Sequence, residues 1–247
     1  MNTVEILGIP FHPLTMIETI AILESFLQTD TNHIVVTPNP EGVMQAKRNP
    51  ELKEALTTAD LSLADGAGIY LAAKIKRKKI PQRVRGVDVT FKLFERLQEK
   101  TVYFLGGKPG VAEKAKAEME NKYPNIKVVG LHHGYFDEDA EIIAEINRLS
   151  PDILLVCLGM PRQELWAVKN KNINARVTMC VGGTLDIIAG EVQLAPAFFR
   201  KIGLEWLYRL FKQPSRFKRQ LDLFRFAIKI LFHNKESGKP LPKRRPN

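Results

Sequence analysis

The sequence has few cysteines, no long apolar run and no segment typical of a signal peptide. Its two cysteines, Cys157 and Cys180, lie in apolar runs and outside any CxxC or Cys/His spacing, which favours buried thiols in a reducing cytosol over disulfides or a zinc site. No apolar run reaches the ~18 residues that a membrane-spanning helix needs. Residues 1–13 have neither a basic start nor a long apolar stretch. We therefore expect a cytoplasmic chain that does not cross a membrane.

Two common phosphate-binding fingerprints are also missing. The sequence has neither the G-x-G-x-x-G pattern of dinucleotide-binding folds nor the P-loop pattern, so neither a nicotinamide cofactor nor ATP is specifically indicated. The pair His132 and His133 has no carboxylate at metal-ligand spacing and is interpreted as two loop histidines. We expect no cofactor and no bound metal.

Basic charge is abundant but confined to one end of the chain. The net charge is +10, and residues 198–247 hold 14 Lys and Arg against 3 Asp and Glu. The other 197 residues hold 23 against 24 and are close to neutral. Such a distribution indicates that the C-terminal segment alone meets an anionic surface.

Strand-like and helix-like runs alternate through the first 195 residues. This alternation is typical of βαβ units, and it predicts a Rossmann-like α/β domain with a mostly parallel sheet and helices on both faces. Thr15 and Glu18 form a capping-box pattern before a helix, and Asp88 is expected to cap another. The predicted strands are residues 4–9, 33–36, 61–64, 101–105, 126–131, 153–158 and 175–181.

Residues 196–247 form a predicted helical appendage. Two helices are expected between residues 198 and 232, with a break at 213–215, and residues beyond about 236 are expected to be disordered. An apolar stripe and a basic face on the second helix favour a helix lying in a membrane interface; packing against the core or a dimer contact are the alternatives. Exposed apolar surface also suggests self-association in water. The stripe is Phe217, Leu221, Phe224, Ile228 and Leu231, and the basic face is Lys218, Arg225 and Lys229.

Polar residues follow several predicted strands, at the edge where parallel sheets bind ligands. Asp65 ends one strand and precedes Gly66 and Gly68; it either faces a ligand or caps the next helix. Thr37 and Asn39 end another strand.

Two glycine pairs and two arginines extend this candidate site. The turns at Gly106-Gly107 and Gly182-Gly183 are expected at helix starts, where backbone N–H groups can bind phosphate, although close packing is the commoner reason for such pairs. Arg83 and Arg85 can clamp a diphosphate; solvated loop charges are the alternative.

Eight motifs in order resemble those of the WecG/TagA/CpsF family of glycosyltransferases. The resemblance runs from about residue 3 to residue 220. The motifs are VTPNPE (36–41), ADG (64–66) followed by Gly68, RVRGVD (83–88), FLGG (104–107), GYF (134–136), LGMPRQE (158–164), VGG (181–183) and GLEWLYRL (203–210).

The resemblance implies an inverting glycosyltransferase at the inner face of the cell membrane. Family members move N-acetylmannosamine (ManNAc), or a related sugar, from UDP to a sugar on a polyprenyl diphosphate. The variant closest in character forms the wall teichoic acid linkage unit, using UDP-ManNAc and the 4-hydroxyl of GlcNAc on undecaprenyl diphosphate. The alternative within the family is transfer of its uronic acid, ManNAcA, or another hexose in common-antigen or capsule synthesis.

The resemblance also implies roles for individual residues. Asp65 is expected to be the general base and Arg83 to stabilise the departing diphosphate. Thr37 and Asn39 are expected to hydrogen-bond a sugar, and Gln163 to position the donor. Three arginines of the appendage, Arg209, Arg216 and Arg219, match family residues expected to bind the lipid diphosphate.

Two rival functions come from other classes. A nucleic-acid-binding protein would explain the basic tail, but the apolar stripe suits lipid better and no RNA-binding signature appears. A soluble nucleotide-sugar enzyme such as an epimerase is disfavoured by the missing dinucleotide fingerprint.

Overall fold

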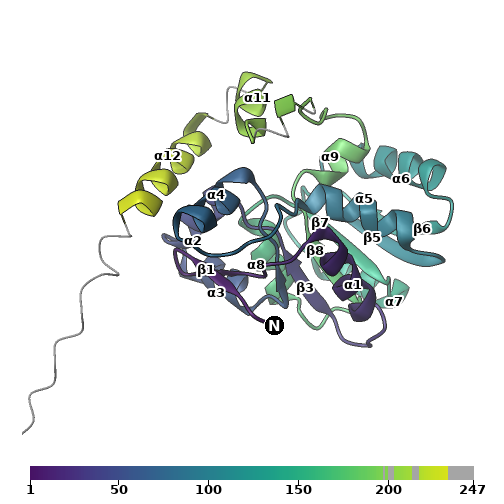
Figure 1. Ribbon diagram of the computed structural model, residues 1–247. Helices are drawn as coiled ribbons and strands as arrows, with labels where there is room; N and C mark the ends of the chain where they lie inside the picture. Colours follow the sequence, from purple (N-terminus) through teal and green to yellow (C-terminus); the bar gives the residue numbers. More distant parts are fainter. Residues whose placement is uncertain (197, 200–202, 213–216, 233–247) are drawn as a thin grey trace, which may run out of the picture.

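A computed structural model shows the predicted α/β domain with a parallel six-stranded sheet at its centre (Figure 1). It describes residues 1–196, 198–199, 203–212 and 217–232. The strand order is β4-β3-β8-β7-β5-β6, and all five neighbouring pairs are parallel, as predicted. The strands are β3 (His33–Val36), β4 (Leu61–Ser62), β5 (Lys100–Gly106), β6 (Ile126–His132), β7 (Ile153–Cys157) and β8 (Val177–Cys180).

Helices cover both faces of this sheet, because its strands are apolar on both sides. Along β5, Tyr103 and Leu105 belong to one core cluster, whereas Val102 and Phe104 belong to the other. The first cluster includes residues of α2 (Pro40–Ala46), α3 (Pro50–Thr58), α4 (Ala67–Ile75), α7 (Ala140–Leu149), α8 (Arg162–Lys169) and α12 (Phe217–Phe232). The second includes residues of α1 (Met16–Phe26), α5 (Gly86–Arg96), α6 (Val111–Lys122) and α9 (Thr184–Ile188). A further helix is α11 (Glu205–Lys212).

Local capping signals were reliable at one predicted helix start and wrong at another. Thr15 and Glu18 form the expected capping box at α1, with the Glu18 carboxylate accepting the Thr15 N–H at 2.7 Å. Asp88 does not cap α5, which begins at Gly86 after the N-cap Arg85. Asp88 instead lies in the first turn, where it forms an ion pair with Arg85.

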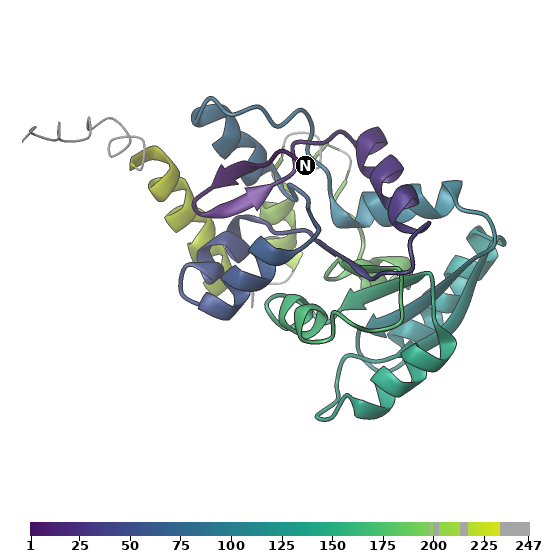
Figure 2. The same cartoon turned by 90° about the horizontal axis from the view of Figure 1, so that it is seen from below.

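The predicted single strand at residues 4–9 is also wrong. The structure has an antiparallel hairpin there, with β1 (Val4–Ile6) and β2 (Ile9–Phe11) in a separate two-stranded sheet. Leu7 and Gly8 both adopt positive φ, at 51° and 86°, which allows a two-residue turn that follows the strand twist. Figure 2 shows this hairpin, in purple, away from the central sheet.

The last helix packs on the domain with one face and exposes the other. α12 lies against α2 and α4, where it buries Asp222, Phe226 and Ile230. Leu221, Phe224, Ile228 and Leu231 of the predicted stripe are exposed. Packing against the core, one of the alternatives for this helix, is therefore confirmed for the face that holds Phe226 and Ile230 and is wrong for the described residues of the predicted apolar stripe.

Some predictions for the appendage fall outside the described residues. They are the break at 213–215, the side chains of Phe217 and Lys218, and the disorder of the last residues. Among the helices that the structure describes, none combines the length and apolarity that crossing a bilayer requires.

Candidate active site at the carboxyl edge of the sheet

The strands β4, β3 and β8 end side by side and bring together three motifs that are far apart in the sequence. Val36 of β3 pairs with Ser62 of β4 and with Cys180 of β8. The residues that follow these positions, including Thr37 and Asp65, therefore lie at one edge of the sheet.

Asp65 is half-buried at this edge and faces the start of α5. Its Oδ2 atom accepts a hydrogen bond from the Gly86 N–H at 3.5 Å. The capping alternative is wrong, because the N-cap of α4 is Gly66 and has no side-chain cap. An acid beside the N-terminal turn of an 11-residue helix meets the positive end of the helix dipole.

Gly86 allows the start of α5 to approach the sheet closely. A Cβ atom at this position would lie 3.1 Å from Cγ2 of Thr37 and 3.2 Å from Cγ1 of Val181. Both distances are shorter than ordinary van der Waals contact, so a side chain here would require Thr37 or Val181 to shift by a few tenths of an ångström. A glycine therefore favours the close approach of α5 to this part of the site.

Arg83 lies on the segment that runs beside Asp65. The N–H of the next residue, Val84, donates to the carbonyl of Ala64 at 3.2 Å, and Arg83 itself is half-buried. The structure thus brings Arg83 and Asp65 to the same edge of the sheet. Their chemical roles stay predictions.

Arg85 is not a solvated loop charge, and its guanidinium is already bound by two carboxylates of the protein. Its side chain is 6% exposed and lies between the carboxylates of Asp88 and Glu205, with an Nη1–Oε2 distance of 3.0 Å to Glu205. Burial lowers the pKa of Arg85, but the ion pairs outweigh that effect and leave it above its ordinary value. Because Glu205 belongs to α11, this pair ties the appendage to the start of α5.

Thr37 and Asn39 already have partners that limit how each can bind a sugar. The Thr37 hydroxyl donates to the Cys180 carbonyl at 2.9 Å, so its oxygen can only accept from a ligand. Asn39 caps α2, with Oδ1 accepting the Gly42 N–H at 2.9 Å. A sugar contact by Asn39 would therefore use the Nδ2 group.

The first glycine pair serves packing more than helix capping. A Cβ atom on Gly106 would lie 2.4 Å from the carbonyl oxygen of Cys157, so β5 and β7 need a glycine here. The Gly107 N–H donates to the same carbonyl at 3.4 Å. The expectation of a helix start at this pair is wrong, because α6 begins at Val111 after the N-cap Gly110.

The second glycine pair is held by Gln163. The Gly182 N–H donates to Oε1 of Gln163 at 3.0 Å, and Gly183 is the N-cap of the short helix α9. Gln163 is 3% exposed, and its Nε2 donates to Glu164 at 2.8 Å. The amide oxygen and the amide nitrogen of Gln163 are therefore both hydrogen-bonded within the protein. Gln163 would thus position the donor indirectly, by holding the turn at Gly182.

Glu164, the last residue of the LGMPRQE motif, is a buried acid for which the sequence predicted no role. It is 0% exposed, and its Oε2 atom has no hydrogen-bond partner. Burial raises the pKa of Glu164 to about 7, despite the hydrogen bond from Gln163. The helical spacing could have predicted this burial, because Glu164 is three residues from Ala167 and both lie on the buried face of α8.

The remaining predicted site residues belong to the appendage. Arg216 and the side chains of Arg209 and Arg219 lie outside what the structure describes. Within the described ranges, no group of three or more His, Cys, Asp or Glu is arranged to hold a metal ion. The metal-independent reaction stays a prediction.

Together, these contacts form a polar rim suited to transfer of a group between two hydroxyl-bearing ligands. A half-buried carboxylate can accept a proton, and a neighbouring arginine can offset negative charge on a leaving group. Thr37 and Asn39 supply directional hydrogen bonds beside them.

Comparisons with known proteins show the family to which the chain is similar. Residues 4–239 match the model of the family described as "Glycosyl transferase WecG/TagA/CpsF family". A relative from Bacillus spizizenii is 31% identical over 219 residues, covering 87% of this chain and 85% of the relative. A relative from Staphylococcus aureus strain MRSA252 is 32% identical over 233 residues, covering 92% and 91%. Both relatives are named N-acetylglucosaminyldiphosphoundecaprenol N-acetyl-beta-D-mannosaminyltransferase.

Proposed function

The chain belongs to the glycosyl transferase WecG/TagA/CpsF family, and from that premise we propose that it transfers ManNAc from UDP-ManNAc to the 4-hydroxyl of GlcNAc on undecaprenyl diphosphate. The product is the ManNAc-GlcNAc unit that links wall teichoic acid to its lipid carrier. The observation that carries the proposal is the meeting of Asp65, Thr37 and the start of α5 at one edge of the sheet.

In the proposed reaction Asp65 is the general base. Its carboxylate takes the proton of the acceptor hydroxyl as that oxygen attacks the anomeric carbon of the donor sugar. The bond from the anomeric carbon to the diphosphate oxygen breaks on the opposite face, so the configuration inverts and UDP leaves with the electron pair. A positioned base of this kind contributes about 10²- to 10⁴-fold to the rate.

Arg83 is the group proposed to offset the charge that develops on the departing UDP. It is half-buried on the segment beside Asp65, where a cation is less screened than in bulk water. The neighbouring Arg85 cannot easily take that role, because two carboxylates already neutralise it. Arg85 instead holds α11 against the site.

We propose that the enzyme acts as a peripheral protein on the inner face of the cell membrane. The exposed apolar face of α12, with Phe224 and Ile228, lies beside the exposed cations Arg225 and Lys229. This combination suits the interface of an anionic bilayer. Arg209, Arg216 and Arg219 are proposed to reach the lipid diphosphate, as the family resemblance implies.

The test is release of UDP from three donors, UDP-ManNAc, UDP-ManNAcA and UDP-GlcNAc, in the presence of a GlcNAc-diphospholipid. We expect acceptor-dependent release from UDP-ManNAc alone. Preference for UDP-ManNAcA would favour the alternative activity within the family, which is transfer of the uronic acid. Absence of release from any donor, together with RNA retention in a filter-binding assay, would contradict the proposal.

A further inference from the structure

Four lysines, each in a helix or directly after one, lie around the contact between α12 and the rest of the domain. Lys47 follows α2, Lys53 belongs to α3, Lys76 follows α4 and Lys229 belongs to α12. α12 packs against α2 and α4, and the charges of Lys229, Lys53 and Lys76 all act on the amino group of Lys47. We call these four residues the lysine cluster.

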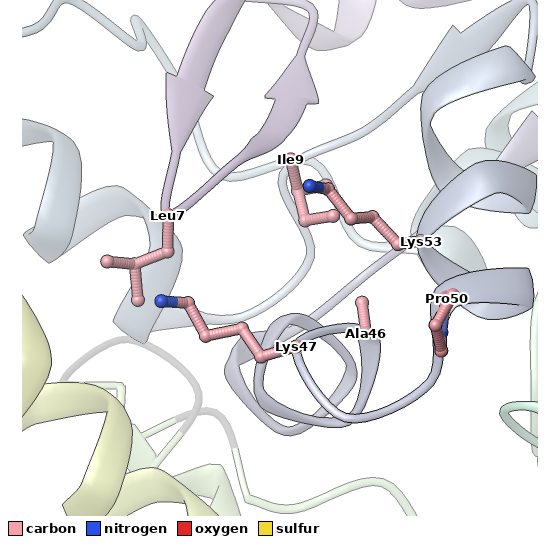
Figure 3. A pocket seen from close by; sticks show the side chains of 6 residues that line it. All are labelled: Leu7, Ile9, Ala46, Lys47, Pro50 and Lys53. Carbon is pink, nitrogen blue, oxygen red and sulfur yellow. The ribbon is translucent and has the colours of Figure 1, made fainter.

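A pocket opens between two of these lysines and the N-terminal hairpin. It encloses about 390 Å³ and is lined by Leu7, Ile9, Ala46, Lys47, Pro50 and Lys53. Figure 3 shows Lys47 reaching from the end of α2 toward Leu7, and Lys53 reaching from α3 toward Ile9. The pocket therefore has an apolar wall and two cationic amino groups, a combination that suits an anionic group attached to an apolar body.

The positive charge of the lysine cluster is not balanced by the part of the protein that the structure describes. No carboxylate of those residues lies within 4 Å of an amino group of the cluster. Arg48, next to Lys47 in the sequence, differs in this respect because it is paired with Asp222. Partial desolvation and the charges of Lys229, Lys53 and Lys76 lower the pKa of Lys47. An anion brought from outside would relieve this repulsion.

The place of the cluster in the fold indicates where that anion comes from. Lys229 stands on α12 next in the sequence to Ile228, whose apolar side chain is exposed. The basic run at residues 74–79 continues the same surface, and Lys78 there donates to the Glu5 carbonyl of the hairpin at 2.8 Å. Cations and exposed apolar groups thus share one side of the molecule, as at surfaces that rest on anionic bilayers.

We propose that the lysine cluster and its pocket bind the phosphate of an anionic phospholipid headgroup, so that the α/β domain itself contacts the membrane next to α12. The site is separate from the edge that holds Asp65. This inference rests on the proposed peripheral placement and extends it, because the sequence had assigned membrane contact to the appendage alone.

The test compares two double variants of the full chain in sedimentation with vesicles. K47Q/K53Q removes two charges from the pocket, and K122Q/K127Q removes two charges at the opposite end of the molecule, near α6 and β6 (Figure 1). A lysine near an anionic bilayer contributes about 1 kcal/mol, so K47Q/K53Q should weaken binding to phosphatidylglycerol vesicles about 30-fold. The control should change it less than threefold, because its charges lie beyond the screening distance.

Removal of the Lys47 charge should not loosen α12, because Lys47 and Lys229 repel each other. Equal weakening by both double variants would overturn the proposal, since it would show a response to net charge alone. Full protection of Lys47 from acetylation by 10 mM inorganic phosphate, without any by phosphatidylglycerol vesicles, would overturn it as well. Protection by those vesicles and none by phosphatidylcholine vesicles would support it.

An assay of sugar transfer to a detergent-solubilised acceptor separates the proposed headgroup site from the proposed enzymatic function. The K47Q/K53Q variant should retain full UDP release in detergent, because its changes lie outside the catalytic edge. Loss of vesicle binding with retained transfer supports the headgroup site. Failure of the wild-type chain to transfer sugar in detergent would contradict the proposed function and would leave the vesicle result as the separate test of the pocket.

Discussion

The guanidinium of Arg48 binds the carboxylate of Asp222 through two parallel hydrogen bonds, at 3.0 and 2.6 Å. Arg225 adds a third contact to the same carboxylate at 3.1 Å. The hydrogen bond from Arg48 holds the pKa of Asp222 below its ordinary value, against the opposing effect of burial. This pair fixes α12 at the C-terminal end of α2, the helix whose N-cap is the candidate site residue Asn39. The position of α12 is thereby linked to the catalytic edge.

We expect the Arg48–Asp222 pair to keep α12 docked. The variants R48Q, D222N and their combination should each expose α12 to faster cleavage by chymotrypsin. A double-mutant cycle of the free energy of unfolding should give a coupling of about 1 kcal/mol, because half of the Arg48 side chain is in solvent. The exposed pair of Lys92 and Glu95 is the control and should give a smaller coupling. Additive effects at Arg48 and Asp222 would show that the pair does not hold the helix.

The D65N variant should lose catalysis and keep its fold. Asparagine retains an oxygen that can accept the Gly86 N–H but cannot take a proton from the acceptor. The turnover number should fall about 10²- to 10⁴-fold, while UDP binding measured by calorimetry and the free energy of unfolding stay near wild type. D137N, on an exposed loop, is the control for loss of one negative charge. Turnover near that of the wild type would remove Asp65 from the mechanism.

Glu164 should make stability fall as pH rises. Its pKa of about 7 in the folded protein exceeds the ordinary value of 4.5, so the folded state holds the proton more tightly. The contribution is complete below pH 4.5, declines as pH rises and is lost above about pH 7. The difference corresponds to about 3 kcal/mol.

Urea unfolding of the wild type and E164Q at pH 5, 6, 7 and 8 measures this effect. The free energy of unfolding of the wild type should drop relative to E164Q across that range, because the amide side chain of the variant does not titrate. Parallel curves for the two proteins would mean that Glu164 does not change its protonation in the folded state in this range.

The two faces of α12 should respond differently to substitution. Phe224 is 59% exposed, so the double variant F224S/I228S should leave the free energy of unfolding nearly unchanged and weaken vesicle binding at least tenfold. Phe226 is 4% exposed in the core, and F226A should cost about 3–5 kcal/mol of stability. Circular dichroism melts and vesicle sedimentation separate the two effects. Unchanged vesicle binding of F224S/I228S would exclude the exposed face as the membrane contact.

The order of elements and the edge that holds the site followed from local sequence patterns. Apolar runs with helical segments between them predicted parallel strands, and the polar residues after those runs predicted that Thr37 and Asp65 would meet. Such patterns are short-range, because side-chain period and turn residues report on a few neighbouring positions.

The predictions that were wrong or missing concern features that depend on backbone conformation or on contacts between residues far apart in the sequence. The hairpin turn needs positive φ at both Leu7 and Gly8. Glycine is the residue type that indicates such a φ in a sequence, whereas leucine gives no such indication. One of the two carboxylates that bind Arg85, that of Glu205, is 120 residues away on α11. Gln163 is bound to a turn that follows another strand.

By itself the sequence determined the α/β class, the family and the polar edge of the sheet, because each of these is written in runs and motifs of neighbouring residues. Only the tertiary structure decided which charges are paired and which are left facing an outside partner. Arg48 meets Asp222 across 174 residues, while the charges of three other lysines lower the pKa of the adjacent Lys47. Electrostatic energy depends on distance in space and on burial, and packing sets both.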